Sequence, residues 1–546
     1  MSVATPTILK DGKAMDPAYE VISIDIRREV NRIPRAELRL FDGSAAKQQF
    51  SVSDSGFFEP GAKIEIKLRH EGEEDKTVFK GLVVRQGVEV GRDGGSILVV
   101  GLKDAAIKLA GARKSAVFRE KSDDEIIKQI VGDAGLETGT LAATEPKHVE
   151  MVQYYSTPWD FILSRADAQG MLVVVDDGKL SLAKMEVSGK AKHHFEYGIT
   201  DILDFEIEAD AGSQYEDVES VAWDIKELKP TTASKAASAA LSPGSFDGST
   251  LGKAIGNGTY TLSHPVPAAP EELKAWADGR MARSRLALCR GRVGVQGFAD
   301  IKPLDVMEIA GVGKRFSGKA LVTGLRQRVD LNVWRTDVQF GLLPETFSQT
   351  ENIIDAPAAG LLPAVSGLQI GVITDFEEDD TQELRVKVIL PAVDPEKGTV
   401  WARLASPDAG AGRGFLFRPE PSDEVVVGFL NNDPRHPVIL GALFSSKNAP
   451  ASSMGEPSAE NELKGIVTRK GTTLGFVDSD KASVFIETAG KNKLLIDDDE
   501  EAISISDQHG NSIILNKDGI VLKSTKDLKI DAQGNVEIKG SKVEVK

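Results

Sequence analysis

The nearest approach to a nucleotide-binding motif lies at residues 311–320, GVGKRFSGKA. Gly313 is followed after four residues by Gly318 and Lys319, which is most of the phosphate-loop pattern. Such a loop also needs a Ser or Thr for Mg²⁺ and a helix N-terminus for phosphate. Here Ala320 occupies the hydroxyl position and the strand-like ALVTGL follows. We therefore predict a turn between two strands, not a nucleotide site.

Other residues offer little spacing suited to metal or nucleophile chemistry. Cys289 is the only cysteine, so neither an intrachain disulfide nor a CxxC metal site can form. The sequence holds no G-x-S-x-G nucleophile turn and no H-E-x-x-H zinc helix. His193 and His194 are adjacent, so on a strand they point to opposite faces and cannot share a metal ion. We expect no catalytic residue, metal or cofactor.

The charge and hydrophobic pattern exclude further functional classes. The 546 residues include 66 Lys and Arg against 83 Asp and Glu, a formal net charge of −17. An acidic chain is poorly suited to bind nucleic acid or an anionic membrane by charge. The start lacks a signal-peptide pattern, and no apolar run approaches the ~20 residues of a membrane helix. We expect cytoplasmic synthesis, no nucleic-acid partner and no stable membrane insertion.

Residues 1–345 are predicted to consist mainly of short strands with helices inserted among them. The segment KIEIKLRH (63–70) alternates apolar and charged residues, which is the pattern of a half-buried strand. Strands separated by turn residues in this way favour a barrel or a closed antiparallel sheet. The stretch 230–260, rich in Ser, Thr, Ala and Gly, is predicted to be an exposed loop.

Three helix starts can be read in the same region. Ser122 lies three residues before Glu125, a capping box that opens a helix ending near Gly135. Thr157 and Pro158 supply an N-cap and a first helical residue for the second helix. A third helix is predicted across 270–289, where Pro270 stands at its start.

Two polar connectors, 346–366 and 446–463, divide the remainder of the chain. Between them, residues 367–445 hold five to six short strands with tight turns. Strands of that number and length fit a small barrel of the OB type. The last segment, 464–546, follows the second connector.

The last segment carries a regular repeat of apolar pairs, in which the two members of each pair lie two residues apart. Successive pairs start 10, 9, 10, 7, 8, 8 and 7 residues apart, with turn residues and charges between them. Such regularity indicates stacked β structure. The pairs are Val484/Ile486, Leu494/Ile496, Ile503/Ile505, Ile513/Leu515, Ile520/Leu522, Leu528/Ile530, Val536/Ile538 and Val543/Val545.

The length of the repeat determines which kind of β structure is expected. A single-chain β-helix needs rungs of ~20 residues or more to surround its own core. Eight residues give one short strand and a bend, so the inward pair has nothing opposite it within one chain. Three chains around one axis would supply the missing surface, with Lys523, Lys529, Glu537 and Lys539 on a charged outer face. We predict an intertwined trimeric needle; an ordinary antiparallel meander is the alternative.

His509 is the one histidine that a threefold axis could turn into a ligand set. Three imidazoles can hold Zn²⁺ or Fe²⁺. However, Asp507-Gln508-His509-Gly510-Asn511 has the composition of a turn, so we expect the ring of His509 to face solvent.

The OB-like block resembles the VgrG spike family of type VI secretion systems and its relatives in extracellular contractile injection particles. The resemblance rests on RVKVILPAVDPEKGTVWARLASPDAGAGRGFLFRPEPSDEVVVGFL (385–430) and NNDPRHPVILGALF (431–444). Upstream, YYSTPWDFILSRADAQGMLVVVDDGKL (154–180) and GKALVTGLRQRVDLNVWRTDVQFG (318–341) resemble the hub module of that family. The resemblance covers nearly the whole chain.

This resemblance implies a mainly β protein with two phage-hub-like barrel domains carrying inserted helices, an OB-fold and a trimeric β-helix. It implies a homotrimer that meets inner tube and baseplate proteins at the hub and a PAAR-like protein at the C-terminal tip, with effectors as cargo. Many relatives continue into a toxin domain, whereas this chain ends at Lys546. Some phage spikes carry a lysozyme domain, but both connectors are too short to contain one.

The function expected from residues and resemblance together is mechanical. The chain would be assembled into an injection particle in the cytoplasm and driven through a target envelope when the sheath contracts. A trimeric tail fibre or adhesin is the main alternative, although it would need a recognition head beyond the needle. A carbohydrate-active β-helix enzyme is a weaker one, and it would be monomeric.

Overall fold

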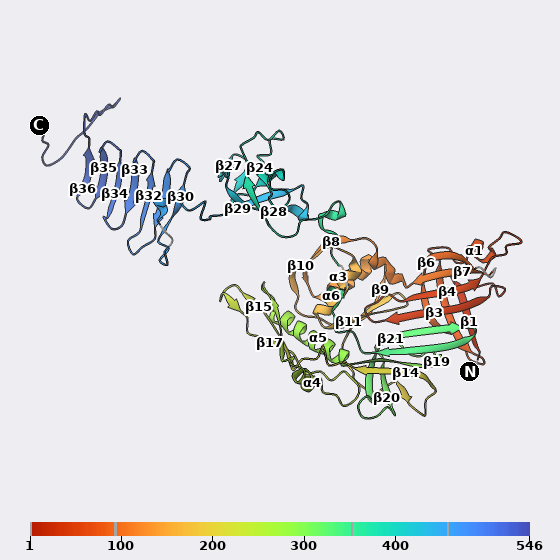
Figure 1. Ribbon diagram of the computed structural model, residues 1–546. Coiled ribbons are helices and arrows are strands. Elements are labelled where there is room, and N and C mark those ends of the chain that lie inside the picture. Colours follow the sequence, from red (N-terminus) through yellow and green to blue (C-terminus); the bar gives the residue numbers. More distant parts are fainter. Residues whose placement is uncertain (1–2, 92–94, 351–352, 456–457) are drawn as a thin grey trace. The chain divides into compact units, whose positions relative to one another are not determined.

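The computed structural model describes residues 3–91, 95–350, 353–455 and 458–546. Residues 351–352 and 456–457 of the two predicted connectors lie outside the described residues. Contacts divide the chain into two compact units, Met1–Asp355 and Ala356–Lys546 (Figure 1). The chain is mostly β, as predicted.

The first unit is built on one 13-stranded sheet. Its main order is β14-β19-β22-β21-β3-β4-β7-β6-β5-β1-β2, and β20 pairs with both β13 and β21. The strands are β1 (Ala4–Lys10), β2 (Lys13–Ala14), β3 (Val21–Glu29), β4 (Arg35–Phe41), β5 (Lys63–His70), β6 (Lys76–Val90), β7 (Ser96–Lys103), β13 (His193–Glu196), β14 (Ile202–Ala209), β19 (Cys289–Gln296), β20 (Val306–Ala310), β21 (Gly318–Asp330) and β22 (Val333–Phe340).

Alternation along the strands places the core of this sheet. In β5, Ile64, Ile66 and Leu68 are buried while Lys63 is exposed, so the predicted half-buried strand is confirmed. These residues join a hydrophobic core formed by β1 and β3–β7, and a second core lies between β13 and β19–β22. The sheet therefore serves two separate cores.

The two halves are hydrogen-bonded into a single sheet, which the prediction of two barrel subdomains did not anticipate. The reason is the length of β21, 13 residues. Its start, from Gly318, pairs with β20, and its end, to Asp330, pairs with β3. One long strand thus links the two cores, and this pairing cannot be read from local alternation.

The inserted helices begin where the sequence predicts them. Helix α2 (Asp123–Asp133) carries the capping box of Ser122 and Glu125, and α3 (Pro158–Ala168) is capped by Thr157. The third, α5, spans Pro270–Leu288. The stretch 230–260 is not only loop, since it contains α4 (Gly248–Ala254), capped by Asp247. The remaining elements are α1 (Ser51–Asp54), η1 (Ala105–Ala110), β8 (Lys114–Lys121), β9 (Glu137–Leu141), β10 (His148–Ser156), β11 (Met171–Asp176), β12 (Lys179–Lys184), β15 (Asp217–Asp224), β16 (Lys229–Pro230), β17 (Ser234–Lys235), β18 (Thr259–His264) and α6 (Phe347–Thr350).

The second unit contains a closed five-stranded barrel of order β23-β24-β25-β29-β28, as predicted for an OB-fold. Its strands are β23 (Gln369–Ile373), β24 (Val386–Ile389), β25 (Thr399–Leu404), β28 (Glu424–Phe429) and β29 (Pro437–Ala442), with a small β26 (Ala409–Gly410) and β27 (Arg413–Gly414) hairpin. Short 3₁₀ turns are η2 (Pro357–Gly360), η3 (Leu430–Asn432) and η4 (Ser452–Met454). Val388, Val425, Val427 and Ile439 fill the barrel core.

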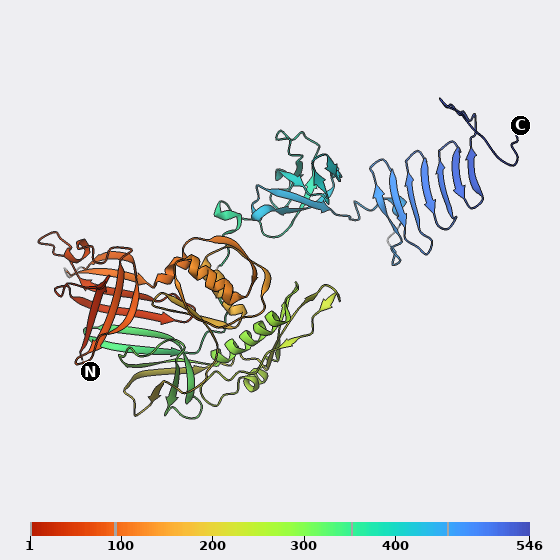
Figure 2. The ribbon, with the colours of Figure 1, turned by 180° about the vertical axis from the view of Figure 1, so that it is seen from behind.

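A seven-stranded antiparallel sheet, here called the needle sheet, follows the barrel in chain order (Figure 2, blue). Its strands are β30 (Leu463–Val467), β31 (Thr473–Val477), β32 (Ser483–Glu487), β33 (Lys493–Asp497), β34 (Ala502–Ser506), β35 (Ser512–Asn516) and β36 (Gly519–Lys523). Each strand has five residues and pairs with the next along the chain. Within one chain the segment is thus a meander.

Candidate functional site

The predicted apolar pairs meet on one face of the needle sheet, called here the aliphatic face. Cross-strand pairing puts Val484 opposite Ile496 and Ile486 opposite Leu494. The same two columns continue strand by strand to β36, where Leu515 faces Ile520. Antiparallel neighbours in such columns lie about 4.5–5.5 Å apart at Cβ. The register therefore brings the first five predicted pairs into one continuous surface.

The aliphatic face is open to solvent in the single chain. Six of its side chains, Ile486, Ile496, Ile503, Ile505, Ile513 and Leu515, are between 38% and 45% exposed. On the last strand Ile520 is 70% exposed. Two columns of exposed branched residues on a regular sheet are unusual for an isolated monomer. The geometry favours an interface that only other chains can complete.

The face also extends beyond the residues that the sequence predicted. Leu474 and Phe476 on β31 lie opposite Ile486 and Val484, and Ile466 on β30 lies opposite Leu474. A signal was present, because Leu474 and Phe476 are two residues apart and stand ten residues before the next pair. On β30 the residue opposite Phe476 is Lys464, so the pattern of apolar pairs stops there.

The opposite face of the needle sheet is less purely polar than predicted. A single column runs down its middle and includes Phe485, Leu495, Ile514 and Val521. The ammonium of Lys493 lies 5.4 Å from the centre of the Phe485 ring. This face therefore has one narrow apolar stripe, interrupted by Ser504, whereas the aliphatic face has two adjacent columns.

The last three predicted pairs lie outside any strand. Among the described residues, no strand is assigned after Lys523. These side chains are more than half exposed in the single chain, and their place in a trimer core stays a prediction: Leu528, Ile530, Val536, Ile538, Val543 and Val545. A short strand needs a paired neighbour to be stable, and here one chain supplies none beyond β36.

The turns of the needle sheet are polar, and His509 lies in one of them, exposed as predicted. The carboxylate of Asp507 accepts hydrogen bonds from the backbone of His509 at 2.8 Å and of Asn511 at 2.9 Å. The side chain of Asn511 also donates to Asp507 and lowers the pKa of that carboxyl. In the part of the chain that the structure describes, no His, Cys, Asp and Glu cluster is arranged to hold a metal.

The two adjacent histidines and Lys319 form contacts with neighbouring strands and loops. His193 and His194 lie on β13 and face different partners: His193 contacts Asp305 at 3.3 Å, and His194 contacts Glu196 at 3.2 Å. The carboxylate of Glu196 accepts this hydrogen bond from the ring and raises the pKa of His194. Lys319 is the second residue of β21 and donates to the backbone oxygen of Gly189 at 2.7 Å. The glycine-rich loop before it joins β20 to β21, as predicted.

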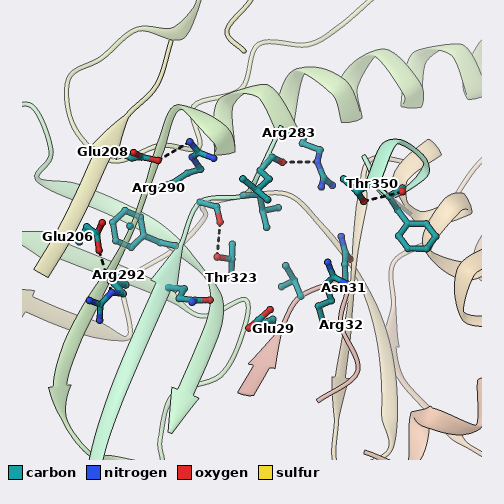
Figure 3. Close-up of a pocket in the computed structure, with 18 residues that line it drawn as sticks. Glu29, Asn31, Arg32, Glu206, Glu208, Arg283, Arg290, Arg292, Thr323 and Thr350 are labelled. Carbon is teal, nitrogen blue, oxygen red and sulfur yellow. Dashed lines mark hydrogen bonds and ion pairs between the residues drawn. The ribbon is translucent and has the colours of Figure 1, made fainter. Parts of the chain in front are cut away.

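A charged cavity of about 520 Å³ lies in the first unit (Figure 3). Arg290 forms an ion pair with Glu208 at 2.8 Å, and Arg292 forms one with Glu206 at 3.5 Å. The carboxylates of β14 therefore balance the positive charges of the β19 arginines. Arg283 on α5 donates to the backbone oxygen of Leu343, and burial lowers the pKa of its guanidinium. These ion pairs make the cavity a polar recess within the first unit.

A buried ionic network links helices α2, α3 and α5. Asp123 is fully buried at the start of α2 and accepts two hydrogen bonds from Arg165 of α3, at 2.7 and 3.0 Å. Arg165 also reaches Glu272 of α5, and His148 of β10 lies 3.2 Å from Asp123. Burial alone would raise the pKa of Asp123, but the guanidinium of Arg165 outweighs it and lowers the pKa. Sequence reasoning missed this network because its members are far apart in the chain.

Family comparisons assign domains to nearly the whole chain. The model described as the Alg8 N-terminal domain matches residues 1–330, more than half of the chain. The type VI secretion system and phage-baseplate injector OB domain matches residues 369–444. The phage baseplate V C-terminal trimerisation domain matches residues 483–546, which include most of the needle sheet. The last match coincides with the aliphatic face.

Individual relatives share only part of the chain. An actin cross-linking toxin VgrG1 of Vibrio cholerae is 29% identical over 109 residues, 19% of this chain and 10% of its own length. A type VI secretion system spike protein VgrG3 of Vibrio cholerae is 30% identical over 133 residues, 23% of this chain. The match spans 13% of that second relative.

Solved structures include a tail protein of Neisseria meningitidis. It is 14% identical with a TM-score of 0.46, and the match covers 62% of this chain and 96% of that protein.

Among the described residues, no helix is both long and apolar enough to cross a membrane.

Proposed function

We propose, from the premise that this chain belongs to the Alg8 N-terminal domain family and is a VgrG-type spike protein, that it forms the central spike of a contractile injection system. In this proposal three copies assemble into one hub and one needle. The sheath drives the assembly outward on contraction, and the needle punctures the target envelope.

The observation that carries the proposal is the open aliphatic face. Three needle sheets around one axis would turn their paired columns toward each other, so that each rung buries about six branched side chains. Each such side chain contributes roughly 1.5–3 kcal/mol when it leaves water. A rod built in this way is narrow, and its chains cannot unfold separately. Both properties suit a part that must bear force.

The hub and the tip would have separate partners. We assign contacts with the inner tube and baseplate to the hub region, residues 1–345, and a PAAR-like cap to the C-terminal end of the needle. Effector proteins would travel as cargo on the assembly. The match of residues 369–444 to a baseplate injector domain supports the placement of this chain in such a machine.

The proposed role is mechanical and needs no catalytic residue. The groups that could have done chemistry are engaged elsewhere: Lys319 with a backbone oxygen, and Arg290 and Arg292 with carboxylates. A mechanical role also accounts for a surface of stacked aliphatic columns, which an enzyme would not require.

Particle isolation from the source cell tests the proposal. A chain tagged at its N-terminus should sediment with sheath and tube, at three copies for each particle. Deletion of residues 464–546 should leave particles that do not breach target cells. A tagged chain found at the cell surface, apart from sheath and tube, would instead favour a trimeric adhesin.

A further inference from the structure

The small barrel carries an aliphatic patch on its outside, along β23, β28 and β29. Ile370 pairs across the strands with Val426, and Ile370 is 45% exposed. Leu368 and Leu440 are 63% and 52% exposed. A Cβ added to Gly428 would lie 3.3 Å from Leu440 and 3.4 Å from Leu368, so both leucines cover that glycine. Together Leu368, Ile370, Val426 and Leu440 form what we call the barrel patch.

The patch is an exception to how the barrel is patterned. Val425 and Val427 point inward and are fully buried, so Val426 between them must point outward. A strand with one solvated face normally carries polar residues there. Three successive valines at 425–427 instead make both faces of β28 apolar.

Strand β24 of the barrel, by contrast, has a polar exterior. On β24, the ammonium of Lys387 forms an ion pair with Glu377 at 2.6 Å and lies over the ring of Trp401. Arg385, the residue before the strand, forms an ion pair with Asp379 at 2.7 Å. The barrel strands thus carry ion pairs at β24 and exposed aliphatic side chains at the barrel patch, and further exposed apolar side chains lie on its loops, among them Leu384, Val393 and Phe417. An exposed aliphatic cluster on regular strands is typical of a surface that meets a partner.

We infer that the barrel patch packs against the barrel of a second copy of this chain, within the same trimer. The inference rests on the proposed trimer. Only the 20 residues 443–462 separate the barrel from the needle sheet. Even when fully extended, 20 residues reach no more than about 70 Å, so a trimeric needle would keep the three barrels within reach of one another.

The tether also explains why a small patch is sufficient. Free proteins need about 800 Å² of buried surface on each partner for a stable interface, and four aliphatic side chains fall short of that. Tethered sites, however, meet at an effective concentration on the order of millimolar. The contact between barrels therefore needs to contribute little affinity, and it extends the trimer interface from the needle toward the barrel.

Cysteine cross-linking in the full chain tests this contact. The only native thiol, Cys289, is buried, and burial raises its pKa to about 11, so it reacts poorly with oxidant. Ile370→Cys should give a covalent dimer on a non-reducing gel, about tenfold or more above Lys397→Cys. Lys397 is exposed on the β24–β25 turn and serves as the matched control. Leu440→Cys repeats the test at a second position if the first variant folds poorly.

The mass of each variant separates the two claims. A trimer in which Ile370→Cys and Leu440→Cys cross-link no more than Lys397→Cys would overturn the barrel contact and leave the patch for a different protein. A monomer would contradict the trimeric spike itself. Trimers with strong cross-linking at both patch positions are the expected result.

Discussion

Ile503 and Leu515 lie directly opposite each other on β34 and β35, and both remain about two-fifths exposed in the single chain. Their neighbours Ile496 and Ile520 extend the same column on the strands to either side. In a monomer this column would keep its apolar surface in water at a cost of roughly 25 cal/mol for each Å². This cost is removed only when another surface covers the apolar column.

A charge placed on the aliphatic face should prevent assembly. Ile505→Asp would bring three carboxylates into the interior of the needle, and each would cost several kcal/mol in a dry core. Ser504→Asp is the matched control, because Ser504 lies one residue away on the opposite face. We expect loss of soluble trimer for Ile505→Asp and a normal yield for Ser504→Asp, measured by size-exclusion chromatography. Equal yields would count against the needle.

The segment after Lys523 should gain order only in the trimer. Its apolar pairs continue the repeat, yet the single chain forms no described strand there. Hydrogen exchange of the wild-type protein should therefore protect amides around Leu528 and Ile530, and Ile505→Asp should remove that protection. Rapid exchange of this segment in an intact trimer would confine the needle to residues 463–523.

The buried ionic network should make the hub region sensitive to acid. Asp123 has a lowered pKa in the folded chain because Arg165 stabilises its carboxylate against the cost of burial. The stabilisation is complete above the unfolded value, about pH 4, and is lost as the pH falls through the lowered pKa. Thermal unfolding followed from pH 6 to pH 3 should show the decline.

Removal of one partner from that network should be costly at neutral pH. Asp123→Asn would leave Arg165 without its buried carboxylate, and such breaks cost about 3–5 kcal/mol. Glu120→Gln, at an exposed position nearby, should leave the free energy of unfolding unchanged. If both variants unfold alike and share one acid profile, the network does not stabilise the hub.

Two glycines show where packing leaves no room for a side chain. A Cβ on Gly279 of α5 would lie 2.5 Å from the Cα of Gly170, which follows α3. Gly279→Ala should destabilise the first unit by about 1–3 kcal/mol. Gly132→Ala on α2 meets no atom within 4 Å and should instead stabilise by about 0.5–1 kcal/mol. Denaturant unfolding compares the two, and the same sign for both would refute the packing argument.

Local pattern was sufficient for much of this fold. Alternation predicted β5, the caps at Ser122 and Thr157 predicted two helices, and apolar pairs from Val484 to Leu522 predicted one shared face. These features depend on residues close in sequence, where periodicity and capping chemistry act directly.

The features that the sequence did not predict depend on pairing between distant residues. The single 13-stranded sheet arises because β21 pairs with β3, about three hundred residues away. The barrel patch forms only when β23, β28 and β29 lie side by side in the closed barrel. The Asp123 network likewise joins side chains of α2, β10, α3 and α5. The apolar stripe of Phe485 and Leu495 does not follow from the pattern of apolar residues two apart, because that pattern assigns the residue between them to solvent.

The mass of the purified chain in solution tests the central claim most directly. One chain weighs 58.6 kDa, so light scattering after size exclusion should give three times that value, about 176 kDa. A trimer that resists unheated detergent would agree with an interlocked needle. A well-folded monomer, with its aliphatic face stable in water, would contradict the trimeric spike.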